Sequence, residues 1–74
     1  MNTETKMITL ADGCEFHGQF IDGMRHGVGI KTYPNGARFT GLYRNDLRHG
    51  RGLKTHANGN QVRVVYENGI KVTK

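Results

Sequence analysis

The chain has 74 residues, of which 35% are hydrophobic, and its formal net charge is +5. This length allows one small domain, and no apolar run approaches the ~18 residues of a membrane-spanning helix. A single cysteine, Cys14, cannot form an internal disulfide, so we expect a reduced, cytoplasmic protein. The basic balance favours acidic proteins, anionic lipid or nucleic acid as partners, or it serves solubility alone.

The predicted strands begin after a polar N-terminal segment. Residues 1–6 lack the apolar core of a secretory signal, and we expect them to form a disordered tail. The domain is expected to cover residues 7–74. Spacing-two alternation of apolar and aromatic residues, as in Phe16, Gly18 and Phe20, is typical of strands. It predicts six or seven short strands at 7–10, 14–21, 27–33, 37–44, 50–56, 60–67 and 70–73.

Turn residues connect these strands into hairpins. Asp12-Gly13, Asn35-Gly36 and Asn58-Gly59 supply the positive φ angles that tight turns need. Longer polar loops are predicted at 22–26 and 45–49. The predicted fold is all-β, a single antiparallel meander sheet.

A repeat of 23 residues underlies this order. Residues 16–29 are answered by 39–52, and residues 30–36 by 53–59. A fixed period of this size is typical of repeat proteins, in which each unit packs only on its neighbours. Glycines at strand positions, such as Gly18 and Gly41, either make room for an aromatic ring or mark bulges.

The repeated pattern resembles the MORN repeat (membrane occupation and recognition nexus). The pattern is aromatic-x-Gly-x-aromatic, then Asn/Asp-Gly/Asp, His-Gly-x-Gly and Tyr-Pro-Asn-Gly, with full copies at 16–38 and 39–61 and partial copies at 7–15 and 62–74. The resemblance implies a twisted meander sheet of β-hairpin repeats with an aromatic-lined groove. It also implies scaffolding, protein binding, dimerisation or phospholipid contact. Lys31 and Lys54 stand where the family commonly has an aromatic residue. In the last, partial copy, Val64 stands at the position that Gly18 and Gly41 occupy in the full copies.

Catalytic chemistry finds no support in the sequence. His26 and His49 are one repeat apart, which places them about 9.6 Å from each other, too far for one metal. Cys14 and His17 are three residues apart on a strand and point to opposite faces. No carboxylate pair is placed for acid–base work. We therefore expect no enzyme, no metal and no cofactor.

Three surfaces are candidate binding sites. The predicted partner-binding groove consists of Phe16, Phe20, Lys31, Tyr33, Phe39, Tyr43, Lys54 and His56. Its lysines either cover apolar sheet with their stems or bind an acidic peptide or a phosphate. A basic rim, more simply a solvated edge, is predicted at Arg25, Arg48 and Lys71. A self-association edge is predicted at Val62, Val64, Val65 and Tyr66, unless residues 70–73 fold back and protect it.

The leading hypothesis for function is a non-enzymatic protein-binding module. It would be an adaptor, an assembly subunit or a small inhibitor that docks on a larger, unidentified protein through the groove and the edge strands, with a homodimer through the C-terminal strand as a further option. The alternative is a binder of anionic phospholipid headgroups or nucleic acid through the lysine and aromatic ladder. Salt dependence separates the two, because phosphate-driven binding weakens steeply with salt.

Overall fold

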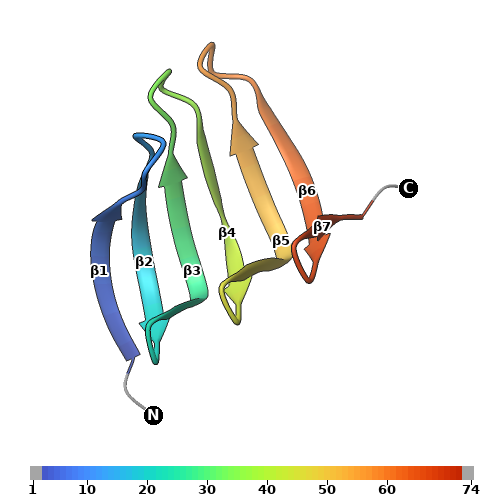
Figure 1. The fold of residues 1–74 in the computed structure, drawn as a ribbon. Coiled ribbons are helices and arrows are strands. Elements are labelled where there is room, and N and C mark those ends of the chain that lie inside the picture. Colours follow the sequence, from blue (N-terminus) through green and yellow to red (C-terminus); the bar gives the residue numbers. More distant parts are fainter. Residues whose placement is uncertain (1–2, 73–74) are drawn as a thin grey trace.

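The computed structural model describes residues 3–72, which form one seven-stranded antiparallel sheet in meander order (Figure 1). The described residues contain no helix, so the predicted all-β meander is confirmed. The strands are β1 (Thr3–Thr9), β2 (Glu15–Ile21), β3 (Met24–Thr32), β4 (Arg38–Arg44), β5 (Leu47–Thr55), β6 (Gln61–Glu67) and β7 (Ile70–Lys71).

The first strand begins earlier than the sequence predicted. Thr3, Glu4, Thr5 and Lys6 belong to β1 and pair with the end of β2, with Thr3 opposite Ile21. The Lys6 ammonium also lies 4.8 Å from the centre of the Phe20 ring. The expectation of a disordered tail is therefore corrected for residues 3–6, because backbone pairing orders a polar segment that has no apolar pattern. Residues 1–2 lie outside the described range.

The predicted long loops at 22–26 and 45–49 are two-residue turns. Asp22 and Gly23 have φ angles of 52° and 79°, and Asn45 and Asp46 have 50° and 71°. Two successive positive φ values give the mirror-image turn that matches the twist of paired strands. The prediction was wrong because the following His-Gly pairs belong to β3 and β5, not to loops.

Bulges absorb the extra residues of these longer strands. The pairing of β2 with β3 shifts between Gly18 and Phe20, and that of β4 with β5 shifts between Gly41 and Tyr43. On the partner strands, Gly27 and Gly50 have φ angles of 81° and 103°, which favour glycine. The repeat therefore encodes a bulge in the β2–β3 and β4–β5 hairpins, and bulges bend and twist a sheet.

A row of glycines crosses the sheet and makes room for the rings. Gly18, Gly29, Gly41, Gly52 and finally Val64 face one another from strand to strand. A Cβ built on Gly41 would lie 2.7 Å from Cζ of Phe39, and one built on Gly29 would lie still closer to Cζ of Phe16. Both predicted roles of glycine therefore occur, at different positions: ring space in this row and bulges at Gly27 and Gly50.

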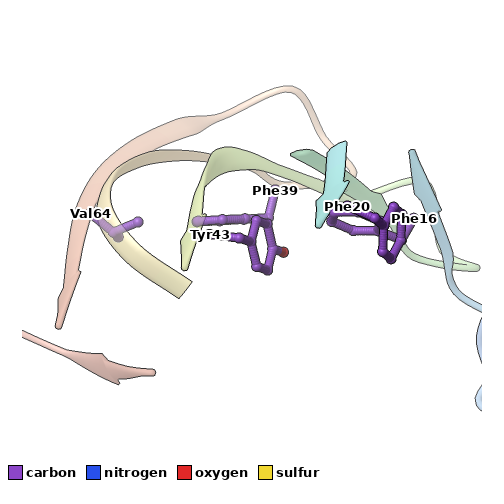
Figure 2. Packing of buried hydrophobic residues seen from close by; sticks show 5 residues of the cluster. All are labelled: Phe16, Phe20, Phe39, Tyr43 and Val64. Atoms are coloured by element: carbon purple, nitrogen blue, oxygen red, sulfur yellow. The ribbon is translucent and has the colours of Figure 1, made fainter. Parts of the chain in front are cut away.

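The buried cluster gathers on one side of the curved sheet (Figure 2). It consists of Phe16, Phe20, Phe39, Tyr43 and Val64, with Ile8, Tyr33 and Tyr66 packed against it. The rings meet edge to face, with centroids 5.0 Å apart for Phe16 and Tyr43 and 5.6 Å apart for Phe39 and Tyr66. Each such pair contributes about 0.5–1.5 kcal/mol beyond its buried area, which suits a small domain without a second layer.

Candidate functional site

The strand register places the predicted groove residues on one side of the sheet, which we call the aromatic face. Lys31 lies directly opposite both Phe16 and Phe39, and Lys54 lies opposite Phe39 and Val62. Residues directly opposite in an antiparallel pair project from the same side. Tyr33 packs against the cluster, and Tyr33, Lys54 and His56 line a common hollow of about 220 Å³ at one end of it.

Burial divides the predicted groove residues into two kinds. The phenylalanines and Tyr43 are buried, with Phe16 at 0% and Tyr43 at 4% exposure. They form a floor that fixes the shape of the face. Lys31 and Tyr33 are half-buried, and Lys54 and His56 are exposed. Only this second group offers side-chain surface to a partner.

Two of the three predicted rim residues are not at a solvated rim. Arg48 lies with its guanidinium 4.1 Å from the centre of the Phe39 ring and 5.3 Å from that of Tyr66. Arg25 lies 5.2 Å from the centre of the Tyr43 ring. The rim prediction was wrong for both arginines because they are paired with Phe20 and Tyr43 in the register, so their side chains extend over the rings. Lys71 is exposed, as predicted.

Arg48 is held by hydroxyl groups. It donates hydrogen bonds of 2.8 Å to the Tyr33 hydroxyl and 3.2 Å to the Tyr66 hydroxyl. Burial opposes its charged form, but the hydrogen bond to Tyr33 and the neighbouring tyrosines outweigh that effect and raise the pKa of Arg48. The guanidinium is therefore charged at neutral pH.

Arg25 is held instead by a carboxylate. Its Nε donates to Oδ1 of Asp46 at 2.7 Å, and its backbone N–H donates to the same oxygen at 3.2 Å. Partial burial would raise the pKa of Asp46, but the hydrogen bonds from Arg25 outweigh this and hold that pKa below its usual range. One repeat later the position of Asp46 is taken by Gly69, whose N–H donates to the Arg48 carbonyl at 2.8 Å.

The two arginines therefore differ in charge balance. Arg25 is neutralised by Asp46, and within residues 3–72 Arg48 has no carboxylate partner. Arg48 lines a hollow of about 430 Å³ on the aromatic face together with Lys31, Tyr33, Tyr43 and Tyr66, and the ion pair of Arg25 and Asp46 lines the same hollow. Within the described part of the chain, the Tyr43 hydroxyl is the buried side-chain polar atom that lacks a hydrogen-bond partner. The hollow is thus positively charged and suited to an anionic oxygen.

The sequence-based prediction placed Arg48 on a separate basic rim instead of in this hollow, and it did not include Asp46. Their signal was present in the 23-residue repeat: Arg25 and Arg48 occupy equivalent positions, whereas Asp46 and Gly69 differ in charge at equivalent positions. Assigning the arginines to a face required the true turn length. With a two-residue turn, they fall opposite the aromatic residues.

The terminal edge differs from the prediction at two residues. Val64 is only 7% exposed and belongs to the buried cluster, and Tyr66 is half-buried under Arg48. Val62 and Val65 are exposed, at 44% and 47%. Val64 therefore ends the glycine row as part of the core and offers no surface at the edge.

The last hairpin covers part of this edge. β7 pairs with Tyr66 and Glu67, and the Val72 N–H donates to the Val65 carbonyl at 2.8 Å. The predicted seventh strand at 70–73 is confirmed at Ile70–Lys71, and residue 73 lies outside the described residues. Across 61–64, the outer side of β6 has no pairing strand in the described chain.

Comparison with known families agrees with the geometry. The MORN repeat family matches residues 16–38 and 39–61 in two consecutive repeats, more than half of the chain. The chain belongs to the MORN repeat family. Repeats of this family are generally non-catalytic modules that bind proteins or membranes. No significant match to a curated protein is found, and residues 3–72 contain no helix long and apolar enough to cross a membrane.

Proposed function

We propose that the chain is a non-enzymatic protein-binding module that docks on a larger protein through its aromatic face. The observation that carries this proposal is the positively charged hollow, in which Arg48 is charged and has no carboxylate partner within the described residues. A site of this kind gains from a partner that supplies the missing carboxylate.

The face offers a partner two kinds of contact. Arg48 uses hydrogen bonds to Tyr33 and Tyr66, and a guanidinium has five N–H donors, so donors remain for an acidic side chain. The Lys31 ammonium lies 5.1 Å from the centre of the Tyr33 ring and is a second cation at the same hollow that has no ion pair within residues 3–72. The partly exposed Tyr33 ring offers apolar surface. An acidic, extended peptide segment of the partner fits this combination.

A charge reversal with a matched control tests the proposal. Tagged wild-type chain, Lys31→Glu and Arg38→Glu are used to capture proteins from the native host. Both variants change the net charge equally, but Arg38 lies on β4 next to Phe39 in sequence and so projects from the opposite side. We expect one protein to be retained by the wild type and by Arg38→Glu, and to be lost with Lys31→Glu.

The opposite result is equally informative. Equal retention by both variants places the partner elsewhere and refutes docking through the aromatic face. Circular dichroism of each variant confirms that the sheet is intact. The captured complex is then washed with increasing salt, since a contact with packed apolar surface persists where a purely ionic one dissociates.

Binding of anionic phospholipid or nucleic acid is the second candidate. It is favoured by Lys31 and Lys54, which share the aromatic face with the tyrosines. Phosphatidylserine vesicles and a single-stranded oligonucleotide serve as probes. Binding to either that falls steeply with salt, together with loss of binding in Lys31→Glu and no captured protein, favours this candidate over the first.

A further inference from the structure

The side of the sheet opposite the aromatic face, which we call the back face, has an apolar centre. Residues that alternate with the aromatic-face residues along each strand project there. Val28 lies opposite Leu42, and Ile30 lies opposite Thr40, which in turn faces Leu53. Val28 is 54% exposed and Leu42 is 42% exposed. Within residues 3–72 no second layer covers this side (Figure 1).

Two arginines border this apolar centre. Arg51 lies opposite Val65, and Arg63 lies opposite Leu53, so the two arginines are diagonal neighbours on β5 and β6. Both are exposed, and together with Val65 they line a hollow of about 380 Å³. The ion pair found among the described residues joins Arg25 and Asp46, so neither back-face arginine is neutralised by a carboxylate there.

The repeat indicates that the fold does not require these arginines. Twenty-three residues earlier, Val28 and Thr40 occupy the positions of Arg51 and Arg63, in strands of the same length and register. Val and Thr are good strand formers at such exposed positions. The second repeat therefore carries two cations where the first shows that uncharged residues suffice.

We propose that the back-face patch, defined as Val28, Ile30, Leu42, Leu53, Val65, Arg51 and Arg63, binds an extended segment of a protein partner that presents aliphatic side chains and carboxylates on one side. The planar guanidinium matches a carboxylate with two parallel hydrogen bonds. The neighbouring aliphatic residues cover the partner's apolar side chains, and removal of exposed apolar surface from water stabilises the contact.

The composition of the patch favours a peptide over a membrane. Membrane-interface surfaces are rich in Trp and Tyr, yet the chain has no Trp, and its tyrosines Tyr33, Tyr43 and Tyr66 all belong to the cluster of the aromatic face. The back face also presents its cations as arginines flanking a hollow. A guanidinium at such a hollow can form two parallel hydrogen bonds with one carboxylate of a peptide.

This inference goes beyond the proposed function, since it concerns a separate surface with its own partner chemistry. A chain with two docking faces can hold two segments at once, one on each side of a single-layer sheet. Such an arrangement suits an adaptor better than an inhibitor.

A model peptide and repeat-derived substitutions test the proposal. The probe is a terminally blocked decapeptide in which leucine and glutamate alternate at every second position, with serine between them, so that both project from one side of an extended chain. A peptide with glutamine in place of glutamate is its control. Binding is followed by amide chemical shifts of the ¹⁵N-labelled full chain.

The protein variant combines Arg51→Val with Arg63→Thr, the residues that the first repeat has at these positions. We expect the glutamate peptide to shift the amides of Val28, Leu42 and Val65, and to bind the double variant at least tenfold more weakly. Lys31→Glu, on the aromatic face, should leave the peptide-induced shifts of Val28, Leu42 and Val65 unchanged even if it weakens peptide binding at the aromatic face, which separates a failure here from a failure of the proposed function.

Several results would refute the proposal. These are equal binding of the glutamate and glutamine peptides, unchanged affinity of the folded double variant, shifts confined to the aromatic face, and no binding at millimolar peptide. Phosphatidylserine vesicles are tested in parallel. If the chain binds the vesicles through Arg51 and Arg63 but does not bind the peptide, the proposal is refuted and the back-face patch is a membrane-binding surface instead.

Discussion

At the residue scale, Arg48 contributes both to the packing of the aromatic face and to its positive charge. Its guanidinium lies over the Phe39 ring and donates hydrogen bonds to two tyrosine hydroxyls, so the aliphatic stem and the charged head both contact protein. A side chain held in this way is part of the core surface. It is also the cation best placed to receive an anionic group.

Replacement of Arg48 should therefore affect stability as well as binding. We expect Arg48→Ala to lower the free energy of unfolding by roughly 2 kcal/mol, since it removes two cation–π contacts and two hydrogen bonds from a half-buried site. Arg48→Lys keeps a charge but not the planar fork, so a smaller loss is expected. Urea unfolding of the three proteins measures this, and an Arg48→Ala protein as stable as the wild type contradicts the role assigned to Arg48.

Asp46 predicts a dependence of stability on acid. Its pKa in the folded chain is lowered from an ordinary value of 3.8, so the folded state favours the charged form more than the unfolded state does. The resulting stabilisation is complete above the unfolded pKa and is lost as pH falls through the folded pKa. Asp46→Asn retains a residue that tolerates positive φ. Thermal melts across this acidic range should show a weaker pH dependence in the variant, and identical slopes would refute the prediction.

At the element scale, the β2–β3 and β4–β5 hairpins each combine a two-residue turn, a bulge, and a pair of facing glycines that leave the backbone uncovered beneath an aromatic ring. The absence of side chains at Gly18, Gly29, Gly41 and Gly52 lets the rings of Phe16 and Phe39 lie directly against the backbone, so that both rings are buried although the sheet has a single layer. Both phenylalanines are at most 1% exposed. The hairpin is thus the smallest unit that provides both a ring and the space for it.

Adding side chains at these glycines should destabilise the sheet. A Cβ on Gly18 would lie 2.7 Å from the Gly29 Cα, and one on Gly41 would lie 2.7 Å from Phe39, so we expect Gly18→Val and Gly41→Val each to cost roughly 1–3 kcal/mol by overpacking.

Val64→Gly provides the comparison at the end of the row. It removes a buried side chain and should also destabilise, through loss of packing instead of overcrowding. Thermal melts of the three variants measure this, and neutral Gly→Val substitutions would contradict the account of ring space.

The sequence predicted the strands well because alternation and turn residues are local signals. Phe16, Gly18 and Phe20 alternate as a half-buried strand must, and the Asn-Gly turns occur where they were expected. The length of the other turns was not predictable from the pattern, because His26-Gly27 is compatible with a loop or with a bulge. That choice depends on pairing across the hairpin, and it also decides which face Arg25 and Arg48 occupy. The sequence therefore predicted that the rings and lysines share one face, but it placed Arg25 and Arg48 on a separate rim; partner binding at this face stays a prediction.

At the scale of the whole molecule, the described sheet has two open sides and two outer edges, one along β1 and one along the part of β6 that β7 does not cover. The outer side of β6 is unpaired across 61–64 in the described chain, with Val62 exposed beside it. An uncovered edge strand is a template for pairing, and we propose a homodimer in which two copies pair antiparallel through this edge.

Light scattering at two different protein concentrations, both in the micromolar range, tests the proposed dimer. A mass above 8.3 kDa that rises with concentration is expected, and Val62→Lys should return it to the monomer value, because a charge beside an edge blocks pairing. Val64 is unsuitable for this test because it is buried. A monomer at both concentrations means that β7 and Val72 protect enough of the edge.

Every strand pairs only with its neighbours along the chain, and β1 and β7 lie at opposite ends of the sheet (Figure 1). A force applied at Thr3 and Val72 would act across the strands, so it would break the ladder hydrogen bonds a few at a time instead of loading them all together. The sheet should therefore yield to tension hairpin by hairpin, at low force. The same local order means that refolding needs no contact between distant parts of the chain, so a chain stretched in this way should close again quickly from whichever hairpin survives.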